Sequence, residues 1–217
     1  MKVKTLLAVA TTSVVMGLWG ASVSADIIFT LGNNPQPDED NILFSASETG
    51  TTIVGEVDHS GVAVDFTSTT GQTLYQNAQG QASITTDNGD PLTSMLVTVP
   101  GYTFGDFILN LQNGTGTATV TVVDNFNATF TYALGNGQNY LTITTANDIN
   151  GNPETISSVS VTFAGAGGFD VFKQPRISQV CNGTECVIPP QSVPEPGILG
   201  LIALGLLSLA VFRRKAQ

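Results

Sequence analysis

The stretch TATVTVVDNFNATFTYALGNGQNYLTITT, residues 117–145, decides the fold class of this chain. In each of its three runs, apolar residues alternate with threonine or alanine: Ala118, Val120 and Val122; Phe130, Tyr132 and Leu134; Leu141 and Ile143. Side chains of a β-strand point alternately to its two faces, so this period of two predicts strands with one buried face and one threonine-rich face in water. Asn136-Gly137 supplies a hairpin turn between the last two runs.

The same period extends on both sides of this stretch. Val159, Val161 and Phe163 repeat it, and a last strand is expected over 169–180, bent at Pro175. Weaker runs lie at 27–31, 42–45, 52–57, 62–66, 82–85, 96–99 and 107–111. About twelve short strands need two packed sheets to cover their apolar faces. We therefore predict an all-β fold, a β-sandwich that is jelly-roll-like.

Composition excludes some classes of function. The 217 residues include 7 basic and 17 acidic ones, for a net charge of −10. A nucleic-acid binder needs basic residues to displace counterions from phosphates, so we expect no nucleic-acid partner. One His and two Cys leave little for zinc or iron–sulfur sites.

The first 25 residues are typical of a secretory signal peptide. Lys2 and Lys4 precede an apolar run over 6–18, and Val23-Ser24-Ala25 offers small residues for cleavage before Asp26. We predict that residues 1–25 direct export of the chain.

The other end of the chain has the pattern of a membrane anchor. Residues 197–212 carry no charge and are followed by Arg213-Arg214-Lys215. As a helix they would extend about 24 Å, slightly less than the ~30 Å hydrocarbon core, and basic side chains that snorkel could supply the difference. We predict a single transmembrane helix within 197–217, with its basic tail in the cytoplasm.

Val193-Pro194-Glu195-Pro196 stands just before this segment, and its prolines hold the chain extended. The order of Pro-Glu-Pro, apolar helix and arginine cluster closely resembles the PEP-CTERM proteins. The resemblance implies an exosortase, a membrane transpeptidase-like enzyme, as partner. It also implies Val193, Pro194, Glu195, Pro196, Arg213 and Arg214 as the sorting motif.

The sequence thus divides into a signal peptide (1–25), a β-sandwich domain (26–180), a linker (181–196) and the sorting helix with its basic tail (197–217). Residues 26–192 hold sixteen acidic residues and only Lys173 and Arg176 as basic ones, so their formal charge is 2 − 16 = −14. Cys181 and Cys186 flank Asn182-Gly183, a tight-turn pair. In the oxidising compartment that an exported chain enters, we expect a structural disulfide between them.

Two acidic segments carry the oxygen ligands that calcium prefers, namely Asp38-Glu39-Asp40-Asn41 and residues 148–152. The alternative is that both are solvated turns, so the metal ligands stay unassigned and no cofactor is expected beyond a structural calcium ion. Tyr75 and Tyr102 are the tyrosines most open to a sugar ring.

Asp58-His59-Ser60 holds the three residue types of a catalytic triad. Neighbours on an extended chain point to opposite faces, so these side chains cannot converge, and His59 is expected in an exposed loop or strand edge. We predict no enzyme activity. A hydrolase would need a cleft with converging carboxylates.

These observations favour an exported, exosortase-processed protein of the cell surface or extracellular matrix. It would pass transiently through the inner membrane and then act as a structural or adhesive protein, with exopolysaccharide as a possible partner. The alternative is a calcium-assisted carbohydrate-binding module that acts in exopolysaccharide.

Overall fold

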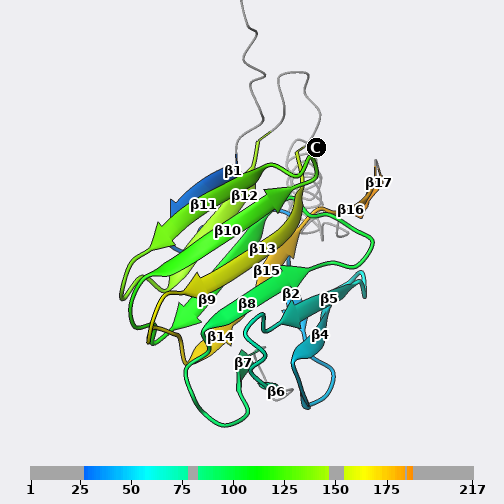
Figure 1. The fold of residues 1–217 in the computed structure, drawn as a ribbon. Coiled ribbons are helices and arrows are strands. Elements are labelled where there is room, and N and C mark those ends of the chain that lie inside the picture. Colours follow the sequence, from blue (N-terminus) through cyan, green and yellow to red (C-terminus); the bar gives the residue numbers. More distant parts are fainter. Residues whose placement is uncertain (1–26, 78–82, 147–153, 184, 188–217) are drawn as a thin grey trace, which may run out of the picture.

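The computed structural model describes residues 27–77, 83–146, 154–183 and 185–187, and all the regular structure in those ranges is β-strand (Figure 1). Every strand pairing is antiparallel. The strands are β1 Ile27–Leu31, β2 Glu39–Leu43, β3 Glu48–Gly50, β4 Thr52–Val57, β5 Ala63–Thr67, β6 Leu74–Asn77, β7 Ser83–Thr86, β8 Ser94–Thr98, β9 Phe107–Gln112, β10 Ala118–Asp124, β11 Thr129–Leu134, β12 Tyr140–Thr145, β13 Ile156–Phe163, β14 Val171–Lys173, β15 Arg176–Ser178, β16 Val180–Asn182 and β17 Glu185–Val187.

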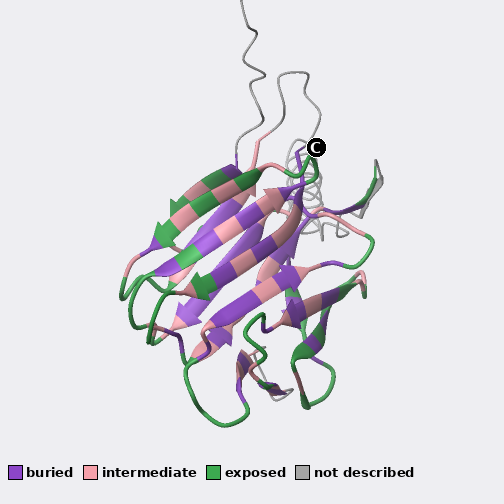
Figure 2. Cartoon of the chain, in the orientation of Figure 1, coloured by how far each residue is buried: buried purple, intermediate pink, exposed green. Residues whose placement is uncertain are grey.

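The front layer in Figure 1 has the strand order β11-β10-β13-β8-β5-β4. β10 and β13 largely alternate between buried and open positions, whereas β11 at the edge alternates between exposed and half-exposed ones, and Figure 2 shows both patterns as bands of colour. One row of the open positions runs across six strands in register: Thr131, Thr121, Ser160, Leu96, Thr67 and Thr52. The outer face of this layer is therefore built largely from small hydroxyl side chains.

The back layer is centred on β9. This strand pairs with β12 on one side and with β14 and β15 on the other, while β1 pairs with the far edge of β12. β14 also pairs with β7, which begins the smaller run β7-β6-β3. Gln174 has a positive φ of 46° and lies with Pro175 between β14 and β15, so the two strands are halves of one interrupted strand.

β2 joins the two layers. Its first residues, Glu39 to Asn41, pair with β15 in the back layer, and Ile42 and Leu43 pair with β4 in the front layer. The opposite side of the sandwich, between β11 and β1, has no such strand. There Phe29 of β1 stacks on Tyr132 of β11, with ring centroids 5.3 Å apart.

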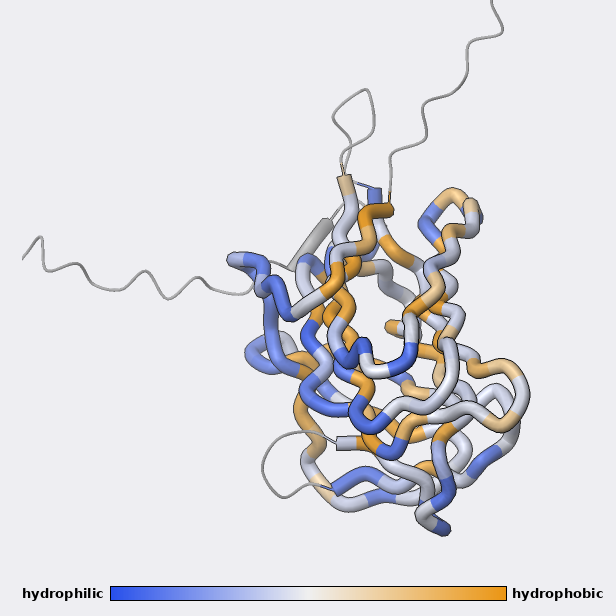
Figure 3. Tube along the Cα trace, turned by 90° about the vertical axis from the view of Figure 1, so that its left-hand side faces the viewer, coloured by the Kyte–Doolittle hydropathy of each residue, from blue (hydrophilic) through white to orange (hydrophobic). Residues whose placement is uncertain are grey.

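The space between the layers is filled by one apolar core. Phe66, Phe104, Phe107, Phe169 and Phe172 are fully buried, and Phe172 contacts three of the other rings. Hydrophobic residues lie along the strands, and hydrophilic residues are concentrated in the connections (Figure 3). The alternation in the sequence thus places a continuous core on one face of each layer.

Residues 32–38, here called the cover segment, cross the outer face of the back layer on the way from β1 to β2. The Asn34 N–H donates to Thr142 Oγ1 (3.1 Å), and the Thr142 hydroxyl donates to the Gly32 carbonyl (2.9 Å). Leu141 and Ile143 lie in the core, so Thr142 points outward and the cover segment passes over that face. Thr142 and Ile108 are each only 1% exposed.

The structure confirms the prediction of an all-β fold with two packed layers; the jelly-roll character stays a prediction. Every strand run expected from the sequence falls in or overlaps a strand, and the expected last strand is divided at Gln174 and Pro175. The sequence prediction missed β3 and β6. It also missed β17: Val180–Asn182 and Glu185–Val187, most of them assigned above to the linker, pair as the β16–β17 hairpin, whose Cys181 exchanges two backbone hydrogen bonds with Thr103.

The predicted signal peptide at 1–25 and the predicted transmembrane helix within 197–217 fall on residues outside the described ranges and stay predictions. Within the described ranges, no helix has the length and hydropathy that a membrane crossing needs.

Candidate functional site

A polar pocket lies at the open end of the β6–β7 hairpin. The hairpin itself is toward the lower end of the molecule in Figure 1. It has a volume of about 200 Å³ and is lined by Gln72, Thr73, Asp87, Asn88 and Asp90. The Asp87 N–H donates to the Thr73 carbonyl (2.9 Å), which extends the β6–β7 ladder by one pair. The hairpin thereby brings two loops that are far apart in the sequence to one point.

Gln72 forms a rigid wall of this pocket. Its Oε1 accepts hydrogen bonds from the Thr93 N–H and the Thr93 hydroxyl, both 2.8 Å, and its Nε2 donates to the Pro91 carbonyl (2.9 Å). The side-chain amide is therefore fixed on both ends by the segment that leads into β8.

The opposite wall is an Asn-Gly turn. Asn88 Nδ2 donates to Asp90 Oδ2 (2.6 Å), and the Asp90 N–H donates to Asn88 Oδ1 (3.2 Å). Gly89 has a φ of +78°, a conformation that glycine adopts without a steric penalty. These bonds leave Asp90 Oδ1 and both carboxylate oxygens of Asp87 without a hydrogen-bond partner among the described residues, so the pocket is rich in acceptors.

Tyr75 lies on the same face of the hairpin as Thr73 and Asp87. In β6 and β7, Leu74, Gln76, Ile84 and Thr86 are buried, so Tyr75 and its register partner Thr85 occupy the half-exposed face. Residues two apart on a strand are separated by about 7 Å. Tyr75 therefore shares a face of the hairpin with two of the residues that line the pocket.

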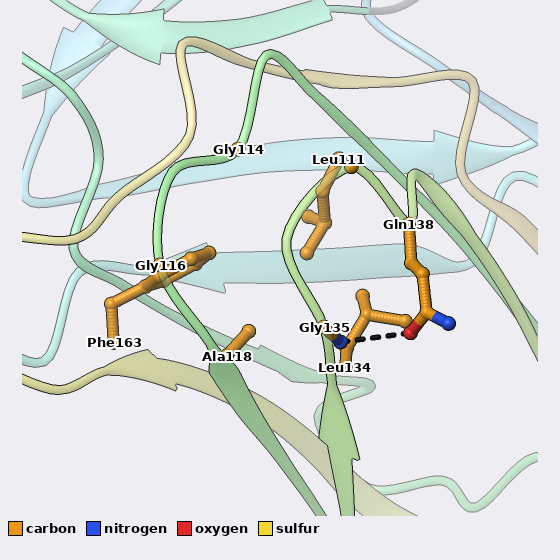
Figure 4. Close-up of a pocket in the computed structure, with 9 residues that line it drawn as sticks. Leu111, Gly114, Gly116, Ala118, Leu134, Gly135, Gln138 and Phe163 are labelled. Carbon is orange, nitrogen blue, oxygen red and sulfur yellow. Dashed lines mark hydrogen bonds between the residues drawn. The ribbon is translucent and has the colours of Figure 1, made fainter.

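A second hollow is too small for a ligand. It lies among the turns after β9 and β11 and is lined largely by glycines, with Leu111, Leu134 and Phe163 as its apolar walls (Figure 4). Gln138 Oε1 accepts a hydrogen bond from the Gly135 N–H (2.8 Å) at its rim. Its volume of about 10 Å³ is close to that of one water-sized probe.

Carboxylates also gather beneath the cover segment, where burial changes their chemistry. Burial raises the pKa of Glu39 to about 7, with Arg176 opposing the change and Asp106 adding to it. Burial likewise raises the pKa of Asp106, although the Ser178 hydroxyl donates to its Oδ2 (2.9 Å). Glu39 can therefore hold a proton near neutral pH, but both groups face a covered surface rather than a pocket.

His59 lies in the β4–β5 turn, as the sequence predicted. Its side chain is 55% exposed, and its Nδ1 is 3.0 Å from Asp40 Oδ1. Burial raises the pKa of Asp40, and the neighbouring His59 opposes that change. Ser60 Oγ accepts a hydrogen bond from the Val62 N–H instead of facing the imidazole.

The calcium segment at 38–41 does not converge on one point. Asp40 is buried with Ile42 on one face of β2, whereas Glu39 and Asn41 point to the other face. Within the part of the chain that the structure describes, no group of three or more His, Cys, Asp or Glu side chains is placed to hold a metal ion. The second calcium candidate, residues 148–152, falls entirely outside that part.

Cys181 is disulfide-bonded, and Cys186, the other cysteine of the chain, stands opposite it in the β16–β17 register. The sorting residues Val193, Pro194, Glu195, Pro196, Arg213 and Arg214 lie outside the described residues. The sequence reasoning missed the pocket at Gln72 and Asp87. The run Asp87-Asn88-Gly89 is by itself only a turn signal, and nothing in it indicates that Gln72 lies opposite.

A family model described as the PEP-CTERM protein-sorting motif matches residues 192–215. The chain carries a PEP-CTERM sorting motif. The match confirms the resemblance found in the sequence, and it indicates an exosortase-sorted surface protein. It covers the C-terminal segment alone and assigns no role to the sandwich.

No curated protein matches the chain. Among solved structures, a family 29 carbohydrate-binding module is 12% identical, with coverage of 79% of this chain and 98% of that chain and a TM-score of 0.26. A mutant of the module CBM29-2 complexed with mannohexaose is 12% identical, with coverage of 72% and 92% and a TM-score of 0.25. Another, complexed with cellulohexaose, is 11% identical, with coverage of 71% and 89% and a TM-score of 0.26. Likenesses at these TM-scores assign neither a fold nor a ligand to this chain.

Proposed function

We propose that this chain is exported, that an exosortase processes it at or near Pro194-Glu195-Pro196, and that its sandwich then has a structural or adhesive role at the cell surface or in the extracellular matrix. The observation that carries this proposal is the sorting motif at residues 192–215. The N-terminal segment supports it, because residues 1–25 have the charge and apolar pattern of an export signal.

The architecture is compatible with a sandwich that stays folded after the C-terminal segment is removed. Both layers are complete by Ser178, the apolar core includes Val180, and the β16–β17 hairpin ends at Val187, before the motif begins. Processing after Val187 would therefore remove no described strand.

The test is the intact mass of the protein recovered from the cell exterior, compared with that of two variants, Glu195→Ala and Arg213→Ala. The parent is expected to lack both ends, and the variants are expected to keep the C-terminal segment or to stay with the membrane fraction. Glu56→Ala, an exposed glutamate of β4, is the matched control and should be processed like the parent. Trimming of Glu195→Ala and Arg213→Ala like the parent would overturn the proposal.

A second candidate is carbohydrate binding by the sandwich, which the polar pocket beside Tyr75 favours. In this role the protein would be held in exopolysaccharide after processing. A chelator decides whether calcium takes part, because calcium-assisted binding would be lost when the ion is removed.

A further inference from the structure

The pocket at the open end of the β6–β7 hairpin has the features of a small saccharide site. We propose that it binds a neutral sugar unit of a polysaccharide through Asp87, Asn88 and Asp90, with Tyr75 as the platform for the next part of the chain. This inference rests on the second candidate function above and does not depend on the sorting step.

The size of the pocket favours a single ring. Its volume of about 200 Å³ corresponds to several water molecules at the ~30 Å³ that each takes in the liquid. Ligand pockets for drug-sized molecules occupy roughly 300–1,000 Å³. One sugar unit of a longer chain would fit, with its neighbours outside the pocket along the half-exposed face of β6 and β7.

The polar atoms of the pocket suit hydroxyl donors. Asp87 and Asp90 together present three carboxylate oxygens that have no hydrogen-bond partner among the described residues. Bonds from hydroxyl groups to ionised carboxylates are shorter and roughly twice as strong as neutral ones. Asn88 and Gln72 have their amides fixed by neighbouring groups, so the site is formed before a ligand arrives.

Charge selects the kind of saccharide. No lining residue of the pocket is basic, and two are aspartates. An anionic sugar would place its carboxylate or sulfate beside Asp87 and Asp90, where like charges repel. The excess of acidic over basic residues in 26–192 adds to that repulsion at longer range. The ligand is therefore a neutral polysaccharide.

Tyr75 supplies the apolar contact that the pocket lacks. Its ring is half-exposed on the same face as Thr73 and Asp87, about 7 Å along the strand from Thr73. Aromatic rings give large contact areas at low entropic loss, and the polar end of tyrosine stays in water.

The experiment uses the full-length chain in mild detergent with soluble mannan and dextran as neutral probes and alginate as an anionic probe. Binding is measured by the retardation of the protein in native gels that contain each polysaccharide. Retardation by a neutral probe and none by alginate is expected. Asp87→Asn is expected to raise the apparent Kd about tenfold, and Tyr75→Ala about two- to tenfold. The control Asp65→Asn, on the outer face of β5, should bind like the parent.

Three outcomes would overturn the inference. One is the absence of retardation by both neutral probes. Another is unchanged binding in both Asp87→Asn and Tyr75→Ala. The third is loss of binding in the presence of EDTA, which would make the pocket a cation site. None of these results would touch the sorting proposal, which the intact mass tests separately.

Discussion

The outer faces of the two layers of this sandwich differ in their exposure to water. The outer face of the front layer is open, and Thr121, Ser160 and Leu96 share one partly exposed row. The outer face of the back layer is closed over β9, where Ile108 and Asn110 are each 1% exposed although neither belongs to the apolar core, and it is open again at β1. The strands are of similar length and pairing. The difference shows that a connection between strands, rather than the strands themselves, decides which face meets water.

The closed face carries a chemical consequence that the open face does not. Glu39 and Asp106 are held where water is scarce, so both have a raised pKa. The side-chain oxygens of Glu39 are buried without a hydrogen-bond partner, and Asn110 is in the same position. Burial without a hydrogen-bond partner favours the neutral form of the Glu39 carboxyl, whereas the Asn110 amide is neutral in either environment.

The largest effect is expected from a large-to-small change under the cover. Ile108→Ala removes a fully buried side chain from the closed face and should lower the free energy of unfolding by about 2–4 kcal/mol. Leu96→Ala is the matched change on the open face and should lower it by about 1 kcal/mol or less, because Leu96 is already partly in water. Urea unfolding of both variants measures the contrast, and equal losses would contradict it.

A change in pH should distinguish the two faces next. Glu39 holds its proton up to a pKa of about 7 in the folded chain, against 4.5 in the unfolded one, so the folded state binds more protons between these values. The stabilisation is complete below about pH 4.5 and is lost as the pH rises through about 7. The loss is below the ~3 kcal/mol of the full pKa shift, because water still reaches part of Glu39.

Glu39→Gln should therefore raise the free energy of unfolding at pH 8 and flatten its decline between pH 5 and about 8. Some decline remains, since burial raises the pKa of Asp106 and Asp40 in the same direction. Glu56→Gln on the open face should leave the slope as it is. A decline as steep in Glu39→Gln as in the parent would mean that the covered glutamate is not its source.

A smaller effect is expected from the anchor of the cover segment. Thr142→Val removes the acceptor of the Asn34 N–H and the donor to the Gly32 carbonyl, and should lower the free energy of unfolding by about 1–3 kcal/mol. Thr144→Val, on the same face of β12 and more exposed, should change it by about 0.5 kcal/mol or less. Thermal unfolding of both variants checks this. Equal losses in the two variants would mean that the hydrogen bonds between Thr142 and the cover segment do not stabilise the fold.

The smallest effect is expected at the contact between β1 and β11, on the side of the sandwich opposite β2. Phe29→Leu and Tyr132→Leu, made singly and together, should show a coupling free energy of about 0.5–1.5 kcal/mol for the stacked rings. A coupling near zero would mean that the layers are held together there by burial alone.

Alternation could predict the front layer because its cause is local. Val159 and Val161 face the core and Ser160 faces water, so the alternation in the sequence matches the alternation in burial. β9 shows the limit of that reasoning. Its residues Phe107 to Leu111 are all buried, since the cover segment closes the second face, and a run of this kind carries no period.

The pocket could not be predicted for a different reason. Asp87-Asn88-Gly89 is a turn signal by itself, and Gln72 is an ordinary polar residue. Only the register of β6 with β7, in which Leu74 faces Thr86, brings these residues together. β6 was missed because its four residues include only one strongly apolar side chain, which is too few for an alternation to be recognised.

β2 and the β14–β15 strand also determine how the fold would carry a mechanical load. β15 is hydrogen-bonded to β9 on one side and to β2 on the other, and β2 passes the connection to the front layer through β4. A pull on the chain beyond β17, first borne by the β16–β17 hairpin, would next load β15 and the two rows of hydrogen bonds that hold it. An edge strand would be held by one such row alone. A protein tethered by its C-terminal side would thus be held at the middle of a sheet.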